Sequence, residues 1–180
     1  FNGDGSAGMN ENREITNSID QTETFKLFSQ KHPLEACELF DSWVREFIRI
    51  FEHSKHFVPG ARFAICDYLE CGVVDEFKVF SSFFSRYGYE CIVCDVRDLK
   101  FDGGALYDDN GLPIHAIWRR SVTNDIIDNW EASQALISAV RERKVALIGS
   151  FAGHLVHDKQ VFKYVKYVRK TIYGKNYFLF

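Results

Sequence analysis

Charged side chains follow three short apolar runs of the sequence. Asp67 and Glu70 come after the first run, Asp95 after the second, and Arg119 with Arg120 after the third. Ligands of open parallel sheets bind beyond the carboxyl ends of the strands, so these side chains share one edge if the runs are parallel strands. Two adjacent arginines can hold a carboxylate or a phosphate through paired hydrogen bonds. The sequence therefore predicts a substrate site that includes Glu70, Arg119 and Arg120.

These residues also have structural interpretations. An arginine at a strand end can form an ion pair with Asp67 or Asp95 instead of binding a ligand. Glu70 can stabilise the N-terminus of the helix that follows it. Because neighbouring residues of a strand point to opposite faces, we expect only one of Arg119 and Arg120 to face the crevice.

Other spacings resemble metal or cofactor motifs without meeting their requirements. Cys91 and Cys94 have the CxxC spacing, but residues three apart in a strand point to opposite faces. His154 and His157 precede a helix with no cysteine or carboxylate pattern to complete a zinc site, so we expect a solvated pair. The sequence does not contain the GxxxxGK of a P-loop.

A strand, a helix and a second strand are predicted over the central part of the chain. Arg62 to Cys66 and Cys91 to Cys94 are short apolar runs typical of strands buried on both faces. Between them, aromatic and aliphatic residues recur at helical spacing over 73–87, and Gly88 provides a stop. Such a βαβ unit implies a parallel sheet.

The same patterns predict the remaining elements. Asn110 and Gly111 favour a hairpin between Ala105–Tyr107 and a strand over Pro113–Trp118. Further elements are expected as helices over 34–53, 124–143 and 158–173 and strands over 145–148 and 177–180. The polar stretch over 16–30 has no clear pattern. The expected fold is a three-layer α/β domain with a mainly parallel sheet flanked by helices.

Composition narrows the functional classes. The chain has 180 residues, 46% of them hydrophobic, with 17 Phe, which favours a well-cored globular domain. A net charge of −3 and no cluster of Lys and Arg give no reason to expect nucleic acid. No apolar run is long enough for a membrane span and there is no signal-peptide pattern, so we expect a cytoplasmic protein with no membrane partner. The five cysteines are then expected to be reduced thiols.

The first eleven residues are rich in glycine and small polar residues. Such a loop can bring backbone N–H groups and the Asp4 carboxylate close to a ligand. The alternative is a flexible terminus with no role in binding.

Several segments together resemble the glutathionylspermidine synthase-like proteins, which carry a circularly permuted ATP-grasp module. These segments, which follow that family's order, are FNGDGSAGMNENRE, CDYLECGVVDEF, RYGYECIV, GGALYDDNGLPIHAIWRR and SFAGHLVHDKQVF. Where the synthases have a Tyr-Pro-Trp-Glu type segment, this chain has Trp118, Arg119, Arg120 and Ser121, so the resemblance does not extend to glutathione and spermidine as substrates.

The resemblance implies a fragment of an ATP-dependent carboxylate–amine ligase that uses ATP and Mg²⁺ to form an acyl phosphate. Asn2 matches the asparagine of the family's Glu-x-Asn metal motif, whose glutamate would precede Phe1. Asp4 and Ser6 match the substrate-side loop. Lys159 matches a lysine that leads into nucleotide-binding elements, although it also suits a solvated first helical turn.

The resemblance also implies a division of the chain. Residues 1–30 would flank the ATP-grasp module, and 31–180 would form a Rossmann-like pre-ATP-grasp domain with the start of the next element. The partners of this fragment would be a small carboxylate, a small amine and the remainder of its own chain. The fragment alone would be inactive and would not bind ATP tightly. The alternative function is a non-catalytic α/β module that binds a small anionic ligand.

Overall fold

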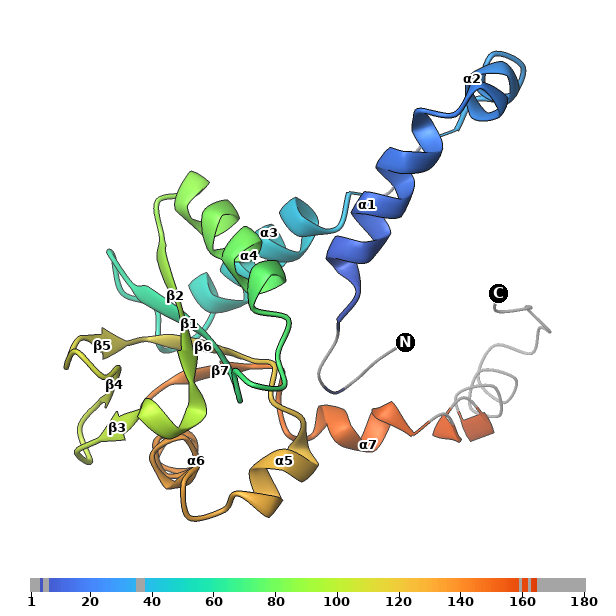
Figure 1. Ribbon diagram of the computed structural model, residues 1–180. Helices are drawn as coiled ribbons and strands as arrows, with labels where there is room; N and C mark the ends of the chain where they lie inside the picture. The colour runs from blue at the N-terminus through green and yellow to red at the C-terminus, as the bar shows by residue number, and fades with distance from the viewer. Residues whose placement is uncertain (1–3, 5–6, 35–37, 159, 162, 165–180) are drawn as a thin grey trace.

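The computed structural model describes residue 4 and residues 7–34, 38–158, 160–161 and 163–164. At its centre is a four-stranded sheet in the order β2-β1-β6-β7 (Figure 1), in which every neighbouring pair is parallel. Its strands are β1 (Arg62–Asp67), β2 (Glu90–Asp95), β6 (Ala116–Arg119) and β7 (Ala146–Ile148). All six residues of β1 are buried, as expected for a central strand covered on both faces. The predicted parallel βαβ unit is confirmed.

Helices α3 (Phe40–Glu52) and α4 (Val74–Arg86) cover one face of the sheet. Their apolar stripes are mainly phenylalanine, and Phe47 and Phe84 pack edge-to-face with ring centroids 5.0 Å apart. Phe63 of β1 contacts both rings, so the helices are joined to the sheet through aromatic pairs. Gly88, with φ 79°, ends the α4 region as predicted.

The opposite face is covered by two short helices and a small sheet (Figure 1). These elements are α5 (Thr123–Asp128), α6 (Gln134–Arg141), a 3₁₀ turn over Val96–Asp98, and the antiparallel strands β3 (Lys100–Phe101), β4 (Leu106–Tyr107) and β5 (Pro113–Ile114). Leu106, Ile114 and Leu136 are fully or almost fully buried beneath them. The three-layer α/β fold expected from the sequence is therefore confirmed.

The strand predicted over Pro113–Trp118 is divided at His115. Pro113 and Ile114 complete the predicted hairpin by pairing with β4, whereas β6 joins the main sheet. The His115 N–H donates to the Arg62 carbonyl at 2.8 Å, and the His115 carbonyl accepts from Ala146 N at 3.0 Å. Because these bonds go to the main sheet, the chain changes sheets at this residue.

The helix predicted over 124–143 is likewise two helices, α5 and α6. Between them, the Ser133 hydroxyl donates to the Asn129 carbonyl at 3.0 Å and lies 2.6 Å from the Tyr68 hydroxyl. Ser133 is fully buried, so this polar contact with the loop after β1 fixes the break. The apolar stripe alone could not reveal it.

The helix predicted over 34–53 begins later, at Phe40. Residues 35–37 lie outside the described part of the chain, and Glu38 and Leu39 are not helical. The Glu38 carboxylate accepts hydrogen bonds from the N–H groups of Phe40 at 2.9 Å and Asp41 at 2.6 Å. It therefore provides the cap that sets the start of α3.

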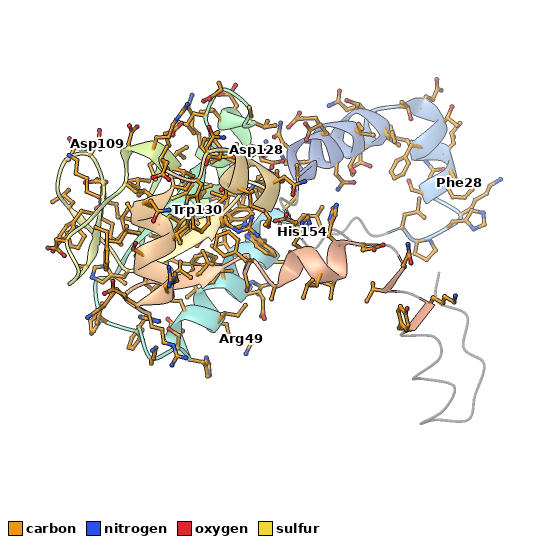
Figure 2. The ribbon with its side chains drawn as sticks, turned by 90° about the horizontal axis from the view of Figure 1, so that it is seen from below. Phe28, Arg49, Asp109, Asp128, Trp130 and His154 are labelled. Carbon is orange, nitrogen blue, oxygen red and sulfur yellow. The ribbon has the colours of Figure 1, made fainter. Side chains whose placement is uncertain are left out.

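An arm of two helices extends from the body of the molecule (Figure 1). It consists of α1 (Met9–Asp20) and α2 (Glu23–Ser29), neither of which has a buried residue. Figure 2 shows Phe28 at the outer end of this arm, and that side chain is 51% exposed. The loop predicted to continue to Glu11 ends earlier, because Met9 to Glu11 already belong to α1.

The C-terminal end of the described chain holds the short helix α7 (Gly153–His157), where the sequence predicted a loop followed by a later helix. Most of the helix expected over 158–173, and the whole strand expected over 177–180, lie outside the described residues. Within the described ranges, no helix combines the length and the apolar character that crossing a membrane requires.

Candidate functional site

The carboxyl edge of the main sheet brings together residues that are far apart in the sequence. The backbone N–H groups of Arg120 and Ser121 both donate to the Cys66 carbonyl, at 2.9 and 3.2 Å. The end of β6 is therefore held against the last residues of β1, where Asp67 lies. This is the edge at which parallel sheets bind ligands.

Arg119 is fully enclosed at this edge. Its Nε donates to the Gly149 carbonyl at 2.8 Å, Nη1 donates to the Ser121 carbonyl, and Nη2 lies 2.6 Å from Asp4 Oδ1. A Cβ at position 149 would lie 2.9 Å from the Arg119 carbonyl, so this close approach requires glycine. Arg119 thus connects Gly149, in the loop after β7, and Asp4 to the end of β6.

Asp4 is the other half of this buried ion pair. Its Oδ2 accepts from the Thr123 N–H at 3.0 Å and lies 2.9 Å from His154 Nδ1. Burial alone would raise the pKa of Asp4, but the bonds from Thr123, Arg119 and His154 outweigh it and lower that pKa to about 2. His154, which Figure 2 labels on α7, is therefore a partner of Asp4 and not a member of a purely solvated pair.

Arg120 lies on a different side of the strand from Arg119 and contacts α4. Its Nη2 is 3.1 Å from Glu76 Oε1, and its guanidinium lies 5.0 Å from the centroid of the Phe77 ring. The side chains of Arg120 and Glu76 are 3% and 0% exposed. The two arginines therefore have separate environments, and their ion-pair partners are Asp4 and Glu76, not Asp67 or Asp95.

Several polar atoms at this edge have no hydrogen-bond partner in the part of the chain that the structure describes. They are Arg120 Nε, Arg120 Nη1, Ser121 Oγ and Thr123 Oγ1. Buried donors are nearly always satisfied in native proteins, and leaving a charged one unpaired is costly. These atoms are therefore the strongest indication of where a polar ligand or ordered water binds.

Asp67 adds a carboxylate beside Arg120. Burial raises the pKa of Asp67 to about 6, although a hydrogen bond from the Tyr68 N–H and the Arg120 charge act against this. Gly72 approaches closely, since a Cβ there would lie 3.0 Å from Asp67 Oδ2. Asp67 is thus partly protonated near neutral pH and suited to exchanging a proton.

Asp95 and Glu70 form the outer rim of the edge through Arg97. Arg97 Nη2 lies 2.7 Å from Asp95 Oδ2 and also contacts Glu70. The Arg97 guanidinium beside Asp95 is the main reason that the pKa of Asp95 falls to about 2. Glu70 is 55% exposed, so its place on the rim leaves it accessible to a ligand.

The structure does not describe three of the residues predicted for the site. Asn2, Ser6 and Lys159 lie outside the described ranges, so their predicted roles in metal, substrate and nucleotide binding remain predictions. Within those ranges, no group of three or more His, Cys, Asp or Glu side chains is arranged to hold a metal ion.

Glu76 was not predicted as a site residue, yet the sequence contained a signal. It is four residues before Phe80 and therefore lies on the apolar stripe of α4, where a charge indicates a buried partner. Ser121 and His154 had no comparable signal, because their contacts depend on how three loops meet.

A cavity of about 340 Å³ lies between α1 and the segment that leads into α3. Met9, Arg13 and Phe40 are among its lining residues, and none of the predicted site residues lines it. A scan of the chain against models of known protein families found no match, and a search of curated proteins found no significant match.

Proposed function

We propose that this chain is the substrate-side part of an ATP-dependent carboxylate–amine ligase and that it binds an anionic substrate group at the carboxyl edge of its sheet. The observation that carries the proposal is that two buried Arg120 nitrogens and the buried Ser121 hydroxyl have no hydrogen-bond partner among the described residues. The ligase chemistry itself rests on the resemblance of the sequence segments to glutathionylspermidine synthase-like proteins.

Arg120 is the group that would hold the anion. Its Nη2 lies 3.1 Å from Glu76, which leaves Nε and Nη1 as donors on two different edges of the guanidinium, each able to donate to a carboxylate or phosphoryl oxygen. The Ser121 hydroxyl would add a third donor. Binding would therefore complete hydrogen bonds that the described chain leaves open.

Asp67 would serve the amine. An amine attacks an acyl phosphate only as the free base, so the site needs a group that accepts a proton near neutral pH. With a pKa of about 6, Asp67 suits that task. In this proposal Arg119 and Asp4 do not bind substrate but form the buried ion pair that joins Asp4 to the end of β6.

The same observation favours a second candidate, a non-catalytic module that binds a small anion. All three proposed donors come from the adjacent residues Arg120 and Ser121 of one strand end. An anion site of this kind needs no nucleotide-binding part.

The test is Arg120→Lys in the full-length protein that contains this chain. Lysine keeps a charge beside Glu76 but cannot place donors on two edges of a planar group. Losing one charge-assisted hydrogen bond is worth about 1.5–3 kcal/mol, so the KM for the carboxylate should rise roughly 10- to 100-fold. The KM would be measured by following ADP release with a panel of carboxylates and amines.

Arg97→Lys is the matched control, because Arg97 is on the exposed rim and should change KM little. Unchanged kinetics in Arg120→Lys would refute the proposed site. A full-length protein that binds an anion through Arg120 but never forms product from ATP would favour the non-catalytic module instead.

A further inference from the structure

Two cysteines meet near the carboxyl ends of the neighbouring strands β1 and β2. Cys66 of β1 and Cys94 of β2 are register partners, and their sulfurs are 3.1 Å apart. Both side chains belong to the core on the α6 side of the sheet, whereas Cys91 packs on the α3 and α4 side. The CxxC spacing of Cys91 and Cys94 therefore conceals a different pair, which only the strand pairing reveals.

We propose that Cys66 and Cys94 form a redox-active dithiol, which hydrogen peroxide converts into a disulfide at the base of the candidate site. Neighbouring strands lie about 4.8 Å apart. This spacing falls inside the range of about 4.4–6.8 Å between Cα atoms that disulfides span. The sulfurs need only approach each other, so the bond can form without separating or sliding the strands.

Exposure and burial set the order of the reaction. Cys94 is partly exposed and Cys66 is fully buried, so the oxidant meets Cys94 first. Burial, and then the contact with Cys94, raise the pKa of the Cys66 thiol, which keeps it protonated and unreactive toward peroxide by itself.

The chemistry balances in two steps. The Cys94 sulfur attacks one peroxide oxygen, the O–O bond breaks, and a sulfenic acid and one water form. The Cys66 sulfur then attacks the Cys94 sulfur, the S–O bond breaks, and the hydroxyl leaves as a second water with the Cys66 proton. Two thiols lose two electrons and two protons, and the peroxide is reduced to water.

The position of this pair links it to the carboxyl edge. Asp67 and Asp95, the next residues on the two strands, are also register partners. The Cys66 carbonyl accepts the hydrogen bonds that hold Arg120 and Ser121 in place. A disulfide here would therefore act on the backbone that supports Arg120 and Ser121. The oxidation itself does not depend on the proposed ligase function.

Peptide mapping of the whole chain tests the proposal. The reduced protein would be treated with hydrogen peroxide under native conditions, alkylated in denaturant and digested without reductant. We expect a linked peptide pair joining Cys66 to Cys94, two hydrogens lighter than the separate peptides and restored by dithiothreitol. Cys94→Ser should abolish the link, and Cys91→Ser should retain it.

Cys71 is an internal control because it is exposed. Peroxide would be increased until dimedone labels the sulfenic acid of Cys71, which proves that the oxidant has acted. If Cys66 and Cys94 are then still fully alkylated in the unmodified protein, the proposal is wrong. A link from Cys94 to any cysteine other than Cys66 would also overturn it.

Discussion

Asp67 is the residue whose protonation should most clearly affect folding near neutral pH. Its pKa is raised from 3.8 to about 6, so the folded protein holds this proton more tightly than the unfolded chain does. The resulting stabilisation is fully present below about pH 4 and is lost as the pH rises through about 6. Asp67→Asn, which cannot ionise, should therefore be more stable than the unmodified protein at pH 7, by on the order of 2 kcal/mol.

Urea unfolding of both proteins at several values between pH 4 and 7 measures this effect. Asp4 and Asp95, whose pKa values are lowered to about 2, lose their stabilisation only as the pH falls below about 4. Groups that both proteins share, such as His56 with its lowered pKa, cancel in the difference between the two proteins, so that difference reports on Asp67. A stability difference that stays constant across the window would contradict the assignment.

The Arg119–Asp4 pair supports a second prediction about folding. Removing one partner leaves the other charge buried, so Arg119→Ala should destabilise the protein by roughly 3–5 kcal/mol. Asp4→Ala on the same background should add less than it does alone, because the two residues share one interaction. Thermal or urea unfolding of the two single variants and the double variant forms a double-mutant cycle. If the losses of unfolding free energy in the single variants add up to the loss in the double variant, the pair is not coupled.

The sequence singled out Arg119 and Arg120 but did not predict their ion-pair partners. Strand alternation correctly separated the environments of the two side chains, since one meets Asp4 and the other Glu76. The partners could not be predicted, because Asp4 and Glu76 are both far from the arginines in the sequence. Long-range polar contacts leave no period in a sequence.

The start of α3 offers a prediction at the level of a single element. Three consecutive N–H groups, those of Phe40, Asp41 and Ser42, donate to the Glu38 carboxylate. Glu38→Ala should therefore cost about 1 kcal/mol of unfolding free energy. Glu46→Ala, which removes only an exposed contact with Arg49, should cost less, and equal losses in the two variants would argue against the cap.

Element types were predicted better than element ends. The four strands of the main sheet and the stripes of α3 and α4 follow from apolar periodicity, which the core enforces directly. The breaks at His115 and at Asn129–Ser133 arise from individual hydrogen bonds to Arg62 and Tyr68. Periodicity carries no information on such contacts, so one strand and one helix were each predicted where the structure has two.

The whole chain should not bind ATP tightly when it is isolated. The GxxxxGK of a P-loop is absent from its sequence, and the proposed function assigns the nucleotide-binding elements largely to other parts of a longer protein. Calorimetric titration with MgATP should therefore give no micromolar binding to this chain, while the full-length protein should bind. Micromolar affinity for MgATP in the isolated chain would refute the proposal that nucleotide binding belongs to other parts of the protein.

The order of the strands also has a consequence for biosynthesis. The central strand, β1, leaves the ribosome with β2 soon after it, but its other neighbour is β6, which begins only at Ala116. At about 5–20 residues per second, one edge of β1 waits for seconds with its hydrogen-bonding groups unpaired, and the face that carries Ala64 and Cys66 waits for α6. Nascent chains that end before Ala116 should therefore engage chaperones or aggregate, whereas chains that extend past β7 should be released from that risk.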